Sequence, residues 1–203
     1  MTLTAGPTPP AAAASVPTDL PRGFLLHENE ATADPLRGQN DRDGWSRGDS
    51  RAARWYVQPC QTSADYASDS ARTAARTLQH LTHDASSVEQ LVVYRDARAA
   101  VAAMAEMRQR LRRCAYDTRG PQTPLRYTVQ PVAIGGEAFR ALGTTVAATT
   151  QAEKMIVVRK GAAIVLYGAF GEVGPVTAGG TADLEKDARR MDGQLCRYTV
   201  AGC

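Results

Sequence analysis

Motifs that mark catalysis or a membrane span are missing from this sequence. It holds no C-x-x-C pair and only three histidines, which leaves few ligands for a zinc site. It has no G-x-S-x-G nucleophile motif, and no spaced pair of acids typical of glycosidases stands out. No apolar run approaches the ~18 residues that a membrane span requires. Catalysis is therefore the minority interpretation, and we expect no catalytic residue, no cofactor and no metal.

An excess of charge of one sign is also absent. Lysine and arginine number 24 against 21 acids, which gives a net charge of +3, and aromatic residues make up 6% of the chain. A nucleic-acid face would show a stronger basic patch interleaved with aromatics. We therefore expect no nucleic-acid partner, and we interpret the arginine-rich helix described below as a solvated surface.

Proline, alanine and threonine dominate residues 1–19, which we interpret as a flexible linker before a single domain at 20–203. This stretch has no basic leader, no adequate apolar core and no lipobox cysteine, so it is not an intact secretion signal. It fits a cytosolic start. It fits equally well a linker that follows a secretion signal or lipid anchor not present in this sequence.

Four cysteines, Cys60, Cys114, Cys196 and Cys203, allow three different sets of two disulfides. We favour Cys60 with Cys114 and Cys196 with Cys203, because each pair then joins elements expected to be neighbours. A bridge between 60 and 114 closes a long loop and would stabilise the fold by about 4 kcal/mol. Four buried free thiols in a cytosolic protein are the alternative.

Residues 88–114 form the clearest structural unit of the sequence. The run Leu91–Tyr94 is β-branched and aromatic, as in a buried strand. Apolar residues then recur at helical spacing up to Cys114, with Asp96 as a suitable N-cap and arginines near the C-terminal end. The pattern predicts a strand followed by an amphipathic helix whose buried stripe is Ala100, Met104, Met107, Leu111 and Cys114.

The rest of the domain is predicted to be mostly β-structure. We expect a loop at 38–53, a strand at 55–57, a hairpin that begins with 70–83, a strand at 125–132, a hairpin over 155–170, a loop at 171–180, a helix at 181–191 and an extended piece at 197–200. This order predicts an α+β fold in which two main helices pack on one face of an antiparallel sheet. The order also resembles a tandem repeat of a β-β-β-α unit.

Five aromatic and arginine side chains of the expected sheet are candidates for a ligand-binding cleft: Trp55, Tyr94, Arg95, Arg159 and Tyr167. Single aromatics on strands are more often part of the core. His80 and His83, beside Asp84, are the residues on which a metal-dependent alternative would depend. On a strand their spacing would place the two imidazoles on opposite faces.

The order of several motifs resembles a known family. It comprises Trp55 and Cys60 in W-x4-C, EQLVVYRDARAAVAAM with a helix ending at Cys114, IGGEAF, IVVRKGAAIVLYG and a helix that closes on Cys196. This order is similar to the PknH-like extracellular sensor domain of actinobacteria, over residues 50–203. The resemblance implies an antiparallel sheet with helices on one side, two disulfides, and a cleft for an unidentified extracellular ligand. The family includes receptor kinases and stand-alone secreted proteins or lipoproteins, and the stand-alone form fits this chain better.

We therefore expect a monomeric, non-catalytic sensor-like module of the cell envelope that binds a small molecule or cell-wall component. A small hydrolase or metal-dependent enzyme that uses His80 and His83 is the first alternative. A structural envelope protein is the second.

Overall fold

A single eight-stranded sheet organises the molecule, which we describe from a computed structural model over residues 17–32, 44–57, 66–81, 85–113, 125–145, 150–175 and 181–200. The strands are β1 (Ala31–Thr32), β2 (Gly44–Gly48), β3 (Arg72–Leu81), β4 (Ala85–Tyr94), β5 (Leu125–Pro131), β6 (Glu137–Thr145), β7 (Thr150–Lys160) and β8 (Ala163–Pro175). Helices α2 (Ala97–Arg113) and α3 (Ala182–Gln194) and three 3-10 turns, η1 (Glu28–Glu30), η3 (Ala67–Ala71) and η4 (Leu195–Tyr198), complete it. None of the helices in these ranges is long and apolar enough to cross a membrane.

Antiparallel pairing runs through seven of the strands, in the order β2-β3-β4-β8-β7-β6-β5, while the two-residue β1 runs parallel to β2. The predicted α+β class and antiparallel sheet are therefore confirmed. Of the seven antiparallel strands, three (β2, β3 and β4) precede α2 and four (β5, β6, β7 and β8) lie between α2 and α3, and the last strand of each set, β4 and β8, pair at the centre of the sheet.

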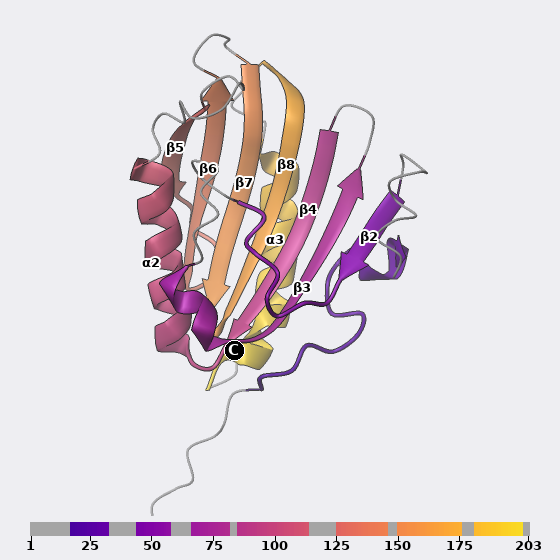
Figure 1. The fold of residues 1–203 in the computed structure, drawn as a ribbon, viewed down its shortest axis with the longest axis vertical. Helices are drawn as coiled ribbons and strands as arrows, with labels where there is room; N and C mark the ends of the chain where they lie inside the picture. Colours follow the sequence, from indigo (N-terminus) through magenta and orange to yellow (C-terminus); the bar gives the residue numbers. More distant parts are fainter. Residues whose placement is uncertain are drawn as a thin grey trace, which may run out of the picture.

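The two helices lie on opposite faces of the sheet, with α2 in front and α3 behind in Figure 1. Met104 and Met107 of α2 pack in one core cluster with Val157, whereas Met191 of α3 packs in a second cluster with Ile156. The prediction that both helices share one face is wrong in this detail. Alternate residues of β4, β7 and β8 point to opposite faces, and these strands are apolar on both, so each face needs a cover.

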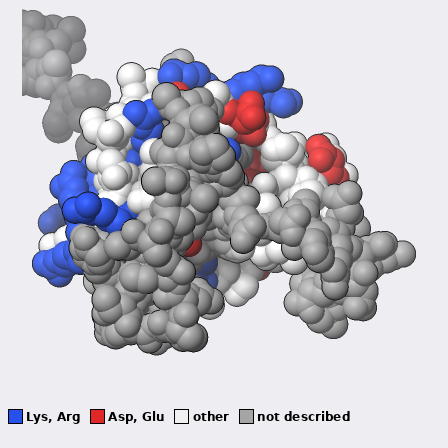
Figure 2. Space-filling view, turned by 90° about the horizontal axis from the view of Figure 1, so that it is seen from above, with Lys and Arg blue, Asp and Glu red and all other residues white. Residues whose placement is uncertain are grey.

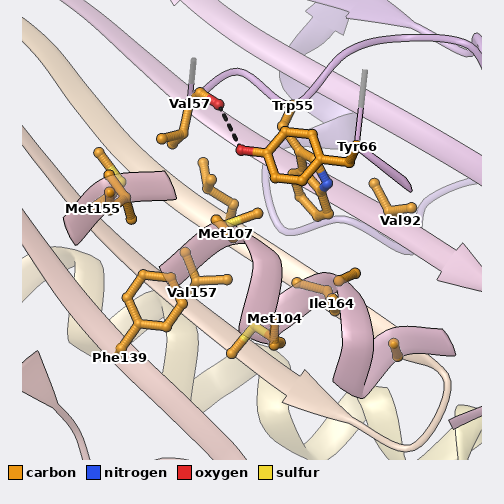
Figure 3. Packing of buried hydrophobic residues seen from close by; sticks show 14 of the residues in the cluster. Trp55, Val57, Tyr66, Val92, Met104, Met107, Phe139, Met155, Val157 and Ile164 are labelled. Atoms are coloured by element: carbon orange, nitrogen blue, oxygen red, sulfur yellow. Dashed lines mark hydrogen bonds between the residues drawn. The ribbon is translucent and has the colours of Figure 1, made fainter. Parts of the chain in front are cut away.

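Helix α2 follows its predicted pattern closely. Asp96 caps its N-terminus, because the side chain accepts a hydrogen bond of 2.7 Å from the backbone N–H of Ala99. The predicted stripe is buried as far as Leu111, and it packs on residues that Figure 3 shows around Met107. Cys114 lies outside the described residues, as do Cys60 and Cys203. The disulfide pairing therefore stays a prediction.

The segment 53–57 crosses the α2-side face of the sheet instead of forming the predicted strand. Trp55 is completely buried there, and Val57 accepts a hydrogen bond from the hydroxyl of Tyr66 (Figure 3). The buried side chain of Gln90 takes the place of a neighbouring strand, since it accepts from the N–H of Tyr56 and donates to the carbonyl of Arg54. The side-chain amide thus satisfies an N–H and a carbonyl group that would otherwise need hydrogen bonds to a neighbouring strand.

Three further boundaries differ from the sequence expectation. The predicted loop at 38–53 contains strand β2, whose polar, glycine-flanked sequence gives little strand signal. Strand β8 continues to Pro175, into the predicted loop at 171–180. The expected extended piece at 197–200 begins within η4, because Tyr198 is buried and its carbonyl accepts a hydrogen bond of 2.9 Å from the N–H of Ala162. The two predicted hairpins are confirmed as β3–β4 and β7–β8.

Replacing Gly161 in the β7–β8 turn should destabilise the fold. Gly161 has φ +55°, and a Cβ there would overlap the carbonyl oxygen of Tyr198. We expect Gly161→Ala to lower the free energy of unfolding by at least about 2 kcal/mol in denaturant titration, from left-handed backbone strain plus the clash. The matched control is Gly193→Ala in α3, where a Cβ meets no atom within 4 Å. That change should be neutral or stabilise by up to ~1 kcal/mol, so equal losses in both variants would contradict the turn geometry.

Candidate functional site

The five residues proposed from the sequence do not share one surface. Trp55 and Tyr94 are completely buried in the core under α2, and Tyr167 is buried in the core under α3. Arg95 is exposed beside Asp96, and Arg159 pairs with a carboxylate of the neighbouring strand at 2.7 Å. Ligand binding by these residues stays a prediction, but the sheet separates them into different environments.

His80 of the alternative metal interpretation lies on β3, where its ring is 5.3 Å from the ring of Trp45. His83 and Asp84 lie outside the described residues. No group of three metal-ligating side chains occurs within the described parts of the chain.

A row of polar and aromatic residues crosses five strands on the α2-side face. Cross-strand register joins Tyr127 to Gly143, Gly143 to Glu153, Glu153 to Phe170, and Phe170 to Ser86. We call these five residues the cross-sheet row. Its four side-chain-bearing members are all partly buried, so they are held in place while still reaching the surface.

Because Gly143 has no side chain, Tyr127 and Glu153 can approach each other across β6. A Cβ at this position would lie 3.1 Å from the ring of Tyr127 and 3.2 Å from the Cβ of Glu153. Without a side chain there, the phenol crosses over β6 and donates a hydrogen bond of 2.7 Å to the Glu153 carboxylate. A glycine inside a strand often marks such a close approach.

Burial raises the pKa of the Glu153 carboxyl, and the hydrogen bond from Tyr127 offsets this effect only in part. Desolvation favours the neutral acid because a partly buried carboxylate loses hydration. A protonated carboxyl can donate one hydrogen bond and accept others. A carboxyl with a raised pKa on an accessible surface is a recognised indicator of a functional site.

An aromatic pair forms the second half of the row. The ring of Phe170 lies 4.7 Å from that of Tyr56, tilted by 52°. The hydroxyl of Tyr56 lies 3.2 Å from the hydroxyl of Ser86 and accepts a hydrogen bond of 2.8 Å from Gln79. Gly168 leaves space for the Phe170 ring, since a Cβ there would lie 2.5 Å from it. Rings, hydroxyls and a carboxyl therefore stand next to one another on one face.

The opposite face carries a polar network that serves the fold. Glu89 of β4 is completely buried, and its carboxylate accepts hydrogen bonds from the N–H groups of Leu26 and His27 and from the hydroxyl of Tyr167, at 2.9, 3.0 and 2.5 Å. Burial raises the pKa of Tyr167 well above its usual value, and the Glu89 charge adds to the effect. The phenol therefore stays protonated and keeps donating.

Beside it, Arg76 of β3 joins a second carboxylate to the sheet. Its guanidinium donates hydrogen bonds of 2.8 Å to the buried Glu28 and lies against Asp49 and the carbonyl of Pro21. Burial opposes ionisation of Glu28, but hydrogen bonds from the backbone and from Arg76 outweigh it and hold its pKa below the usual value. Both networks fix residues 20–30 to the sheet.

The fold and the cross-sheet row define an α+β domain with helices on both faces and a polar-aromatic surface on one of them. Among solved structures, the extracellular domain of PknH from Mycobacterium tuberculosis has the same fold, with a TM-score of 0.54 and 12% identity. The match covers 90% of this chain and 100% of the PknH chain. At this identity the likeness concerns the fold alone. No protein-family model matches the sequence, and no curated protein matches it.

The pKa of Glu153 makes stability depend on pH in a defined direction. A carboxyl whose folded pKa is raised holds its proton longer in the folded state, so its contribution to stability falls as pH rises above the usual value of 4.5. We therefore expect the wild type to lose stability relative to Glu153→Gln between pH 4.5 and neutral pH, measured as thermal midpoints of both proteins across that range.

The control for this comparison is Glu137→Gln. Burial opposes ionisation of Glu137, but Arg159 and Arg108 outweigh it and lower its pKa. Its contribution is fully present above pH 4.5 and is lost only as pH falls below 4.5 through the lowered pKa. The difference between wild type and Glu137→Gln should therefore stay flat from pH 4.5 to neutral pH, and wild type should lose stability relative to this variant only below pH 4.5. A flat difference between wild type and Glu153→Gln would show that Glu153 is not desolvated.

Proposed function

We propose that this chain is an extracytoplasmic, sensor-like module that binds a small molecule or a cell-wall component at the cross-sheet row, without catalysing a reaction. The observation that carries the proposal is the row itself. Glu153 and Tyr127 supply a hydrogen-bonded carboxyl–phenol pair, and Phe170 with Tyr56 supplies an apolar edge. Sites for small polar ligands combine apolar contact area with a few fixed polar groups in this way.

The fold supports the sensor-like part of the proposal. The PknH structure compared above is an extracellular domain, and its fold matches 90% of this chain. Strand order, not loop structure, brings the members of the row together, so the site is held by a rigid element. Residues fixed on neighbouring strands keep their spacing when a ligand arrives.

An oxidising location follows from the same proposal. We infer disulfides between Cys60 and Cys114 and between Cys196 and Cys203, in a secreted or lipid-anchored protein of the envelope. Intact mass before and after reduction distinguishes this from the cytosolic alternative, in which all four thiols would be free in unreduced protein.

The proposed function predicts saturable binding that depends on the row. Muropeptides, the disaccharide units of peptidoglycan and neutral oligosaccharides would be titrated by isothermal calorimetry against the wild type, Phe170→Ala and Glu153→Gln. We expect a bound fragment to lose about tenfold or more in affinity in Phe170→Ala, through loss of the ring contact. Glu153→Gln should retain the shape of the row and weaken ligands that bind the ionised carboxylate.

The control variant is Trp45→Phe, which changes an aromatic residue packed against the α3-side core. It should leave the affinity unchanged. Equal weakening in Trp45→Phe and Phe170→Ala would show that the losses come from general destabilisation. If none of these compounds binds the folded wild type, the proposed ligand class is wrong.

A further inference from the structure

The outer face of α2 carries positive charge at both ends of the helix. The exposed residues of this face are Arg98, Val101, Ala102, Ala105, Gln109, Arg112 and Arg113, which we call the arginine face. Figure 2 shows lysine and arginine gathered on the side of the molecule where α2 lies. Within the described ranges, Arg98, Arg112 and Arg113 form no ion pair with any acid.

The helix dipole accounts for only part of this charge. Arg110, Arg112 and Arg113 lie in the last turn, where cations are stabilised by the negative end of the helix. Arg98 lies in the first turn, where the dipole favours acids, and that turn contains no acid. Asp96 at the N-cap supplies the acid that this end of the helix favours, so the dipole does not account for the position of Arg98.

A hollow of about 800 Å³ lies against the C-terminal half of the same face. Its described lining includes Ala102, Ala105, Arg108, Gln109, Arg112 and Arg113. The alanines let a ligand approach the helix closely, and two exposed guanidiniums stand at one end.

The acids near this hollow are already neutralised. Glu106, which also lines it, receives a charged hydrogen bond of 2.8 Å from Arg110. The carboxylate of Glu137 forms ion pairs with Arg108 at 2.6 Å and with Arg159 at 2.7 Å. An incoming anion would therefore meet the uncompensated charge of Arg112 and Arg113.

We propose that the arginine face binds a linear, phosphate-bearing polyanion that lies along α2. Arg98 and Arg112 are about 21 Å apart along the helix axis at 1.5 Å per residue, so one short anion cannot reach both. A flat anionic bilayer would not follow a hollow. Stacking of nucleic-acid bases needs rings, and the arginine face has none. Guanidiniums recognise phosphate oxygens through paired hydrogen bonds.

The test uses the full chain and inorganic polyphosphate as the probe, with binding followed by fluorescence anisotropy of an end-labelled polymer at low salt. The variants are Arg98→Ala and the double change Arg112→Ala/Arg113→Ala. The matched control is Arg189→Ala/Arg190→Ala, an exposed adjacent pair on α3 that removes the same charge from the opposite face. Unlabelled polyphosphate, orthophosphate and phosphatidylglycerol vesicles are the competitors.

We expect the α2 double variant to weaken polyphosphate binding by about tenfold and to flatten the dependence of log affinity on log salt. Arg98→Ala should weaken binding by a smaller factor, the α3 pair should change it little, and orthophosphate should compete poorly. Equal losses in the two double variants would mean that binding follows net charge only and would overturn the site. So would competition by vesicles but not by unlabelled polyphosphate, or absence of polyphosphate binding by the folded wild type.

Discussion

A buried carboxylate at the centre of the sheet is the constraint on which the rest of the structure depends. Glu89 has no exposed surface, so its charge is tolerable only while the N–H groups of Leu26 and His27 and the hydroxyl of Tyr167 are all in place. These three donors come from the N-terminal segment and from β8. The carboxylate thus joins the start of the domain to its central strand pair, and Arg76 with Glu28 fixes the same segment beside it.

This constraint determines which face is available for function. The α3-side face is closed at its centre by α3, by η4 and by residues 20–30, which the two carboxylates hold against β3 and β4. On the other face, α2 and the segment that contains Trp55 cover the centre of the sheet and leave the cross-sheet row partly accessible. The two buried carboxylates that hold the N-terminal segment therefore lie on the opposite side of the sheet from the cross-sheet row.

Most elements of the fold could be predicted from the sequence, because the apolar runs of β4, β7 and β8 and the helical spacing in α2 and α3 are strong local signals. The same apolar runs also indicated that both faces of the sheet are covered. Leu91, Val92 and Val93 are all buried, which only a sheet covered on both sides allows. Strand β2 and the path of Trp55 were not predictable, because their backbone partners come from distant residues. Gln90, which holds the segment of Trp55, reads in the sequence as an ordinary strand residue.

The candidate site was missed for a related reason. Each strand contributes one residue to the cross-sheet row, so only the register of the folded sheet brings the row together. Gly143 and Gly168, isolated glycines within β-rich runs, are the one local signal that could have indicated it. The aromatic residues that stood out in the sequence, Trp55, Tyr94 and Tyr167, are core residues in the structure.

The most direct test of ligand binding at the cross-sheet row is amide chemical-shift mapping of the folded protein with soluble peptidoglycan fragments. The account predicts shifts concentrated at Ser86, Glu153 and Phe170, and shifts confined to the α3-side face or absent altogether would contradict it.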